Sequence, residues 1–535
     1  MRKIFVIGSS VALIIALALS LFVSNWWWIL MGIVLMLTIF GYYDMIQKQH
    51  SIMRTFPLVG RLRYWMEDIR PKIYQYFVES DTDGKPISRI DRSSIYQRAK
   101  LQTDTMPFGT QLDVYAEGYE WIMHSIAPKD FNTLDTSPRL IFGNKDCKQP
   151  YSASIFNVSA MSYGSLSSNA IEALNGGAKI DNFAHNTGEG GISPYHLKHE
   201  GDLIWQIGTG YFGCRNEDGS FSAELFAEKA KFPTVKMIEL KISQGAKPGH
   251  GGILPASKNT PEIAAIRHVQ IGTVVASPPF HSAFDTPKEM VLFLKQLRDL
   301  SGGKPVGFKL CIGRKSEFIA ICKAMIALDI YPDFITVDGA EGGTGAAPQE
   351  FSNYVGVPLL DGLAFVDNML NGMDIRHHIK LIASGKVLSG FHIVRAIALG
   401  ADACNSARAM MMALGCIQAL LCNTNKCPTG VATQDPSLVV GLDVNDKKYR
   451  VANYHRSMLR TFAELMGACG IDHYKKLSRS HIYRRVFQNE MRSFEEIYPS
   501  LDKGCLLRGE IPEKYVADFE HAHIDNWGDF TINPR

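Results

Sequence analysis

The stretch Val306–Gly343, "VGFKLCIGRKSEFIAICKAMIALDIYPDFITVDGAEGG", contains one complete unit of an alternating α/β fold. Val306–Leu310 is a short apolar run typical of a strand, and the following "SEFIAICKAMIALDI" has the apolar spacing of a helix. Phe334–Val337 is a second short apolar run, and the Gly-rich turn "DGAEGGTGAAP" (338–348) follows it. Strands that alternate with helices in this way predict β–α–β units and a parallel sheet.

The same rhythm extends over most of the chain. We expect eight strands, at Ile155–Ser159, Phe183–His185, Ile238–Ser243, Thr273–Ser277, Val306–Leu310, Phe334–Val337, Ile379–Ala383 and Ala403–Ser406. Eight β–α units in about 250 residues is the size of a (β/α)8 TIM barrel. A doubly wound sheet is the alternative, because alternation alone does not show that the sheet closes.

The turns after the predicted strands are rich in glycine and polar residues. They read "AMSYGSLS" (160–167), "NTGEGG" (186–191), "QGAKPGHGG" (244–252), "PPFHS" (278–282), "DGAEGGTGAAP" (338–348) and "SGKVLSG" (384–390). Glycine allows backbone N–H groups to approach an anion or a flat ring closely, and TIM barrels carry their chemistry in these loops. No P-loop motif is present, and no G-x-G-x-x-G follows the first strand, so ATP and Rossmann-type NAD sites are not favoured.

The N-terminus is a compositional outlier, because residues 4–43 contain no charged side chain. One helix of that length would measure about 60 Å, twice the hydrocarbon core of a bilayer. We therefore expect a two-helix transmembrane hairpin within residues 1–45, with helices over 4–23 and 27–43. Basic residues on both sides predict that both ends and the catalytic domain lie in the cytoplasm, at the inner membrane. A signal peptide is the alternative, against which the second apolar run argues.

Three further segments complete the predicted organisation. We expect a connector over residues 46–150 that packs on the barrel, the barrel and a cysteine loop over 151–435, and a C-terminal helical extension over 436–535. The formal net charge of +3 and the absence of a Lys/Arg run give no reason to expect a nucleic-acid partner.

Three of the ten cysteines crowd into one short segment, whereas the others are scattered, as in a protein of a reducing compartment. Cys416, Cys422 and Cys427 have the spacing C-x5-C-x4-C. That spacing differs from the C-x2–4-C pairs of zinc sites, and three thiols do not pair into disulfides. Zinc with a remote fourth ligand and structural free thiols both remain open at this point.

Six motifs, in this order along the chain, make a family resemblance specific. They are "AMSYGSLS", "NTGEGG", "ELKISQGAKPGHGGILP", "SPPFH", "EGGTGAAP" and "CNTNKCPTGVATQD". Over roughly residues 105–465 the chain resembles the FMN-binding synthase domain of glutamate synthase. The resemblance implies a TIM barrel with FMN and a [3Fe–4S] cluster, which reductively converts 2-oxoglutarate and ammonia to glutamate. It also implies an electron partner, either ferredoxin-like or linked to quinone.

The chain departs from the large glutamate synthases at several places. It shows no N-terminal nucleophilic cysteine, glutaminase domain or C-terminal β-helix, and His250 stands where the large enzymes have glutamate. The turns after the seventh and eighth strands also differ. The chain therefore looks like the stand-alone members, for which free ammonia or a partner glutaminase would supply nitrogen.

The resemblance also assigns expected site residues. It makes the three clustered cysteines the ligands of the iron–sulfur cluster, consistent with thiolate ligation and a proline after the last ligand. We expect FMN to be bound by Ala160, Met161, Ser162, Gln244, Lys309, Ser384, Gly385, Lys386, Ala407 and Arg408. Of these, Lys309 would stabilise negative charge on the reduced ring, and Arg408 would clamp the phosphate.

The predicted catalytic residues are Lys309, Gln244, Glu189 and His250, and the predicted substrate contacts are Gln206, Lys247, His281 and Glu341. A lysine can pair with a carboxylate, and a histidine can transfer a proton near neutral pH. Each side chain could instead be a satisfied structural polar group. Two other functions remain open: a membrane flavin dehydrogenase that oxidises an amine or amino acid and reduces quinone, and a non-enzymatic membrane redox sensor or scaffold.

Overall fold

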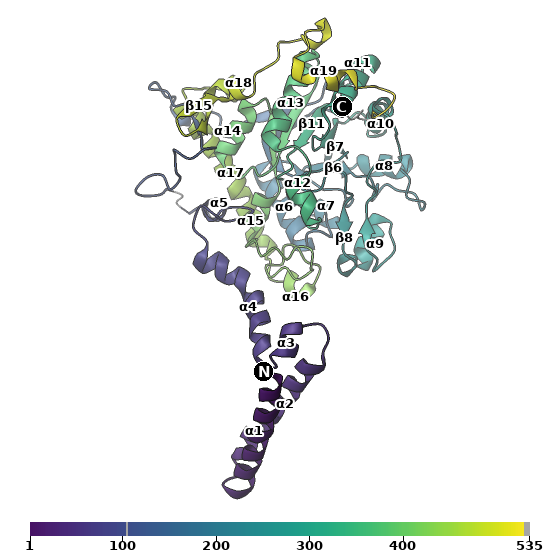
Figure 1. Cartoon of the computed structure of the whole chain (residues 1–535). Coiled ribbons are helices and arrows are strands. Elements are labelled where there is room, and N and C mark those ends of the chain that lie inside the picture. Colours follow the sequence, from purple (N-terminus) through teal and green to yellow (C-terminus); the bar gives the residue numbers. More distant parts are fainter. Residues whose placement is uncertain (103–104, 529–535) are drawn as a thin grey trace. The chain divides into compact units, whose positions relative to one another are not determined.

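The computed structural model describes residues 1–102 and 105–528 (Figure 1). They form two compact units, Met1–Ile90 and Asp91–Arg535. In the first unit, α1 (Arg2–Phe22) and α2 (Trp27–Ile46) pack against each other as a hairpin, followed by α3 (Ser51–Thr55), α4 (Val59–Ile73) and the π-helical turn η1 (Tyr74–Val78). By length and composition both α1 and α2 could cross a membrane. The expected pair of apolar helices is confirmed.

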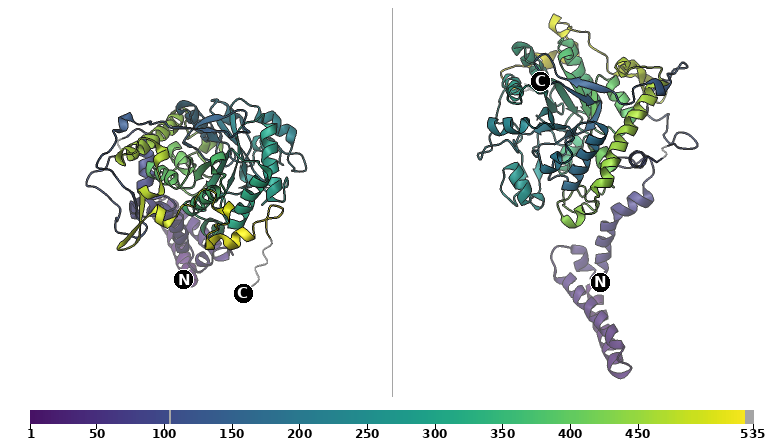
Figure 2. Two further views of the ribbon diagram at one scale, coloured as in Figure 1. Left: turned by 90° about the horizontal axis from the view of Figure 1, so that it is seen from above. Right: turned by 180° about the vertical axis from the view of Figure 1, so that it is seen from behind.

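The second unit is built on a closed barrel of eight parallel strands (Figure 2). In barrel order these are β4 (Phe156–Val158), β5 (His185–Asn186), β6 (Leu203–Ile207), β7 (Val235–Lys241), β10 (Val306–Leu310), β11 (Phe334–Asp338), β12 (Lys380–Ser384) and β13 (Ala403–Ser406). β13 pairs with β4, which closes the sheet. The TIM barrel prediction is therefore confirmed, and the doubly wound alternative is excluded.

One of the eight expected strands was wrong. The predicted strand at Thr273–Ser277 lies outside the barrel, where β9 (Val275–Ala276) pairs antiparallel with β8 (Ile253–Leu254). The third barrel strand is instead β6, which the sequence analysis missed. Every residue of β6 is buried, so its sequence lacks the alternation that marks a half-exposed strand. Strand propensity at 273–277 was real, but propensity does not specify the pairing partner.

Helices follow the strands and form the outer layer. They include α6 (Ser168–Asp181), α8 (Ala223–Ala230), α10 (Pro287–Leu300), α11 (Lys315–Leu328), α13 (Leu359–Gly372) and α14 (Gly390–Ala398). After β13 the chain first forms the short helix α15 (Arg408–Leu414). The long helix α17 (Val444–Ala468) comes later and packs along α6 and α14 as the outer helix of the eighth unit. The cysteine loop is therefore inserted between the eighth strand and the helix that covers it.

Besides the β8–β9 pair, segments outside the barrel add two more small sheets. β2 (Arg139–Phe142) and β3 (Tyr151–Ser154) form a hairpin just before the first barrel strand. β1 (Glu120–Ile122) joins β14 (Ile482–Phe487) and β15 (Glu490–Ser493) in a three-stranded antiparallel sheet. The C-terminal extension, expected to be helical, therefore also contains two strands, in addition to α18 (Phe494–Ile497) and α19 (Glu513–Glu520).

Candidate functional site

The loops at the carboxyl ends of the strands touch one another through their backbones. The N–H group of Gly245 donates to Asp338 Oδ2 at 2.9 Å, and the N–H group of Gly339 donates to the carbonyl oxygen of Ser384 at 2.8 Å. Ser384 Oγ also lies 3.2 Å from Ser159 Oγ. A Cβ atom on Gly245 would lie 1.9 Å from the carbonyl oxygen of Gly339, so only glycine permits this approach. The loops after β4, β7, β11 and β12 thus form one mouth.

A buried ion pair links the end of β7 to the loop after β5. Lys241, the last residue of β7, places Nζ 2.9 Å from Oε1 of Glu189, and Ser277 Oγ donates to Oε2 of the same carboxylate at 3.2 Å. Burial alone would raise the pKa of Glu189, but Lys241, Arg267 and Lys247 lower it to about 2. The pKa of Lys241 is lowered, mainly by burial and against the pull of Glu189. The Glu189 carboxylate is therefore ionised, and its negative charge favours the protonated form of Lys241.

Lys241 was not among the predicted site residues. It stands between the apolar residues Leu240 and Ile242 at the buried end of β7, where an unpaired lysine would be costly. That contrast between residue type and surroundings was the available signal. Gln244 and Glu189, which were predicted, lie on the loops after β7 and β5 as expected.

Two further lysines bring positive charge to the mouth. Lys309 Nζ, near the end of β10, lies 3.6 Å from Oδ2 of Asp338, and both side chains are largely buried. Lys247 Nζ donates to the carbonyl oxygen of Ala346 at 2.7 Å, and burial lowers the pKa of Lys247 to about 8. An anion bound nearby would restore the usual protonation of this lysine.

Arg408, at the start of α15, reaches across the mouth to the loop after β11. Its Nη2 donates to the carbonyl oxygen of Glu341 at 2.9 Å. Its guanidinium lies so close to Gly343 that a Cβ atom there would be 2.3 Å from Nε. The backbone N–H group of Leu359 donates to the Glu341 carboxylate, and burial raises the pKa of that carboxyl group. Glu341 therefore faces its own loop in this structure.

Counted together, the charged side chains of the mouth are predominantly positive. The cations are Lys241, Lys247, Lys309, Arg267 and Arg408, and the carboxylates are Glu189, Asp338 and Glu341. Buried charges are stable only when they are paired. A site with this imbalance is suited to an anionic ligand.

The remaining predicted cofactor residues lie where the barrel rule places them. Ala160, Met161 and Ser162 follow β4, Ser384 ends β12 with Gly385 and Lys386 after it, and Ala407 and Arg408 follow β13. Ser162 Oγ is 3.0 Å from Ser165 Oγ and accepts a hydrogen bond from Arg267 Nη2 at 3.3 Å. The structure therefore brings these segments to one end of the barrel.

Two predicted substrate residues make hydrogen bonds within the protein, and their substrate role stays a prediction. Gln206 Nε2 donates to Glu239 Oε1 at 2.6 Å, inside the barrel, where Asn186 and Thr336 also donate to that carboxylate. His281 Nε2 lies 2.8 Å from the carbonyl oxygen of Lys241, and burial lowers the pKa of His281 to about 4. Its neutral ring fixes the backbone at the end of β7.

His250 lies on the loop after β7, partly exposed at the rim. Its Nδ1 is 2.9 Å from the carbonyl oxygen of Gly251, and its ring meets Phe351 edge-on at 5.2 Å between centroids. One imidazole nitrogen is thereby tied to the loop, and Nε2 is the nitrogen that can face a ligand.

The cysteine loop is fastened to the loop that follows β4. Gln434 Nε2 donates to the carbonyl oxygens of Gly164 and Leu166 at 3.1 and 2.8 Å, and the N–H group of Ser167 donates to Val431 O at 2.9 Å. A buried lysine, Lys258, adds a second link, since its Nζ donates to the carbonyl oxygens of Ser165 and Ala432 at 3.0 and 2.8 Å. The sequence analysis missed Lys258, which stands in the polar run "ASKNT" and carries no local signal.

The thiols of this loop differ in their surroundings. Burial opposes ionisation of Cys427, but the hydroxyl of Thr429 and the backbone N–H groups of Ala432, Thr429 and Val431 favour the thiolate, so its pKa is lowered. Burial raises the pKa of Cys416 to about 11. Cys422 and Cys427 also interact electrostatically with each other and with Lys258.

Over residues 1–102 and 105–528, no three His, Cys, Asp or Glu side chains converge as metal ligands do. The donor set of the cysteine loop nevertheless fits an iron–sulfur cluster in number and chemistry, because three thiols, backbone N–H donors and a buried cation lie on or beside it. The ligand assignment stays a prediction.

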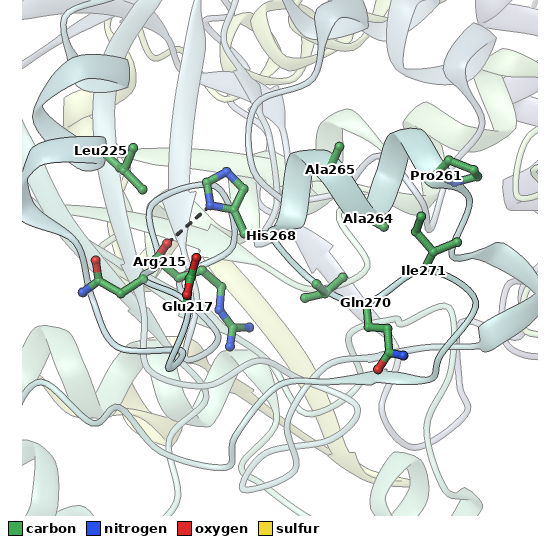
Figure 3. Close-up of a pocket in the computed structure, with 11 residues that line it drawn as sticks. Arg215, Glu217, Leu225, Pro261, Ala264, Ala265, His268, Gln270 and Ile271 are labelled. Atoms are coloured by element: carbon green, nitrogen blue, oxygen red, sulfur yellow. Dashed lines mark hydrogen bonds between the residues drawn. The ribbon is translucent and has the colours of Figure 1, made fainter.

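A separate surface pocket of about 890 Å³ lies between the segment Arg215–Glu217 and the short helix α9 (Pro261–Arg267) with the turn after it (Figure 3). His268 Nδ1 is 3.3 Å from the carbonyl oxygen of Arg215 on its wall. None of the residues lining this pocket belongs to the predicted site.

Comparison with known proteins identifies the family. A family model described as a conserved region in glutamate synthase matches residues 93–472. The glutamate synthase large subunit-like protein YerD of Bacillus subtilis is 38% identical over 481 residues, which cover 83% of this chain and 91% of that protein. Archaeal-type glutamate synthase [NADPH] of Thermotoga neapolitana is 35% identical over 321 residues, covering 59% of this chain and 60% of the relative. The chain therefore belongs to the glutamate synthase family.

Proposed function

We propose that this protein is an FMN- and [3Fe–4S]-containing oxidoreductase that makes glutamate from 2-oxoglutarate, or the corresponding amino acid from a related oxo acid, with ammonia. In balance, 2-oxoglutarate, ammonium, two electrons and two protons give glutamate and water. A ferredoxin-like carrier would supply the electrons. The observation that carries this proposal is the excess of buried positive charge at the mouth of a barrel of this family.

FMN, when bound, supplies hydride transfer to the substrate carbon. Its phosphate would be held after β12 and β13, where Arg408 can form a bidentate contact. Its ring would lie against the loop after β4 and against Gln244, with Lys309 near its electron-rich edge. The close contact of the loops at Gly245 and Gly339 supports this assignment in one respect, since it holds the segments that would contact the ring at one end of the barrel.

The chain's own residues would bind the dicarboxylate and manage its protons. Lys247 can pair with a substrate carboxylate, which would offset the burial of its ammonium group. Glu189 keeps Lys241 protonated by the ion pair at 2.9 Å, so that a second cation is available beside it. His250 could exchange a proton with a ligand from the rim.

The three cysteines would hold the cluster beside the loop that follows β4, to which Gln434 and Lys258 fasten them. That placement supports the cluster as the point at which electrons enter or leave. The apolar helices α1 and α2 support placement at the inner membrane with the barrel in the cytoplasm.

The test is anaerobic purification of the full chain followed by optical and EPR spectroscopy. We expect a flavin spectrum and the signal of an oxidised three-iron cluster. The chemically reduced protein should then be reoxidised by 2-oxoglutarate with ammonium, but by neither alone. Absence of both spectra would refute the cofactor assignment, and failure of reoxidation with both spectra present would refute the substrate assignment.

The two candidate spans favour one second function, a membrane dehydrogenase that oxidises an amine or amino acid and reduces quinone. Stopped-flow reduction of the oxidised flavin by glutamate, with transfer to a soluble quinone analogue, would support it. No reduction by amino acids, together with reoxidation by 2-oxoglutarate and ammonium, would exclude it.

A further inference from the structure

The helix α4 and the turn η1 present an unusual amount of apolar surface. Leu62, Trp65 and Met66 are 53%, 59% and 56% exposed. The turn η1 adds exposed aromatic side chains, including Phe77, which is 85% exposed. Single exposed apolar residues are normal on a protein surface, but a contiguous group of them marks an interaction site.

The apolar residues of α4 lie on one face. At 3.6 residues per turn, the following six residues fall within one third of the circumference: Val59, Leu62, Trp65, Met66, Ile69 and Ile73. None of the six is fully buried. Within the first unit, residues 1–90, the face therefore has no partner that covers it.

Charged residues of α4 are sorted around that face. Arg61 and Lys72 border it on one side, and Arg63 and Arg70 border it on the other. The two acidic residues, Glu67 and Asp68, lie outside the face, and Glu67 forms an exposed ion pair with Arg63 at 2.7 Å. An apolar face with a basic border and acidic residues outside it suits a surface that is apolar inside and negatively charged at its edge.

The link between α4 and the helical hairpin supports the same partner. Arg61 donates from Nε and Nη2 to the two carboxylate oxygens of Asp44, at 2.9 and 2.6 Å, and the Asp44 side chain is fully buried. The Arg61 guanidinium also lies 5.1 Å from the ring centre of Phe40 in α2. This contact ties the start of α4 to the end of the second candidate span, so α4 begins where a membrane surface would lie.

A second copy of the chain is a poorer partner for this face. Two such faces packed together would bring the bordering arginines and lysines of both helices close to one another, and like charges would repel. Anionic phospholipid headgroups attract the same residues, and Trp65 and the tyrosines of η1 are side chains typical of the membrane interface.

We propose that α4 and η1, residues 59–78, bind the surface of an anionic phospholipid membrane next to the hairpin. The apolar face lies among the headgroups and upper acyl chains, and Arg63, Arg70 and Lys72 contact lipid phosphates, while Arg61 stays paired with Asp44. The inference rests on the proposed membrane placement of α1 and α2, and it adds a lipid preference that the hairpin alone does not give.

The experiment is hydrogen–deuterium exchange on the full chain in nanodiscs of phosphatidylcholine, with or without one quarter phosphatidylglycerol. Amides of residues 59–78 should exchange more slowly in the anionic discs. The variant R63Q/R70Q should lose roughly five-fold of that protection for each arginine removed. Glutamine keeps helix propensity, so α4 itself should persist. The matched variant D68N, outside the face, should retain the difference.

Equal exchange of residues 59–78 in the two kinds of disc would overturn the proposal, as would protection that rises with protein concentration instead of lipid charge. Peptides of α1 and α2 provide an internal reference, because they should be protected in both discs. Rapid exchange in α1 and α2 would refute the membrane span. The lipid dependence of residues 59–78 is measured from other peptides in the same experiment, so the two outcomes can be distinguished.

Discussion

Replacement of Glu189 by glutamine should destabilise the barrel strongly. The change keeps the size of the side chain but removes the carboxylate bonded to Lys241, at 2.9 Å in a buried position. The pKa of Glu189 falls from an ordinary 4.5 to about 2 in the folded protein. That depression corresponds to about 3 kcal/mol of stabilisation of the charged form. It agrees with the loss of about 3–5 kcal/mol that follows when one partner of a buried pair is removed.

The assay is urea unfolding of the full chain in detergent, monitored by a signal from the barrel. We expect E189Q to lose about 3 kcal/mol at pH 7. The double variant E189Q/K241M should recover much of that loss, because it leaves no unpaired ammonium. The matched control is D329N, which removes the exposed partner of Lys145 and should leave stability nearly unchanged.

The pH dependence provides a second measurement. The folded pKa of Glu189 is depressed, so its contribution is complete above the unfolded pKa of 4.5 and disappears as the pH falls towards about 2. The difference between the parent and E189Q should therefore shrink below about pH 4.5. A difference that is independent of pH, or single-variant losses that simply add in the double variant, would refute the ion-pair reasoning.

Three other changes test different parts of the site. Gly245→Ala should destabilise the loops and weaken flavin retention, since its Cβ atom would collide with a backbone oxygen at 1.9 Å, whereas Gly313→Ala, with open space around it, should be neutral in the same thermal and flavin-binding assays. Arg408→Lys should weaken flavin binding by about ten-fold in equilibrium titration, because an ammonium cannot make a bidentate phosphate contact; unchanged affinity would contradict the phosphate role. Lys258→Met should lower the iron content of the purified protein and shift the cluster potential, and an unchanged EPR midpoint would rule out its influence on the cluster.

The barrel could be predicted because the same strand–helix pattern occurs many times along the sequence. Short apolar runs such as Val306–Leu310, each followed by a helix, occur several times along the chain. A strand assigned wrongly in one unit therefore does not change the assignment of the other units. β6 was missed because its five residues are buried on both faces and include Trp205 and Gln206, a mixture without strand periodicity. The hairpin of β8 and β9 has the composition of a strand, but its pairing is decided by tertiary contacts that no local pattern records.

The position of a predicted site residue in the barrel could be inferred where a loop alone fixes it, while its role stays a prediction. Arg408 and Lys386 follow the last two strands, and barrel geometry brings those loops together. Gln206 and His281 could not be judged in this way, because their roles depend on partners far along the chain, Glu239 and the carbonyl oxygen of Lys241. Hydrogen bonds of that range become visible only in three dimensions.

The position of the cysteine loop follows from the closure of the barrel. β13 pairs with β4, so the loop after the eighth strand must lie beside the loop after the first, whatever residues they contain. The sequence between β7 and β10 is long enough to carry Lys258 to the same place, where it bonds to a carbonyl oxygen of each loop. Three segments distant in sequence are thereby held together by hydrogen bonds from the Lys258 side chain to backbone carbonyl oxygens. The thiols and the loop after β4 are therefore adjacent in the folded chain itself, as electron transfer between two sites in this barrel would require.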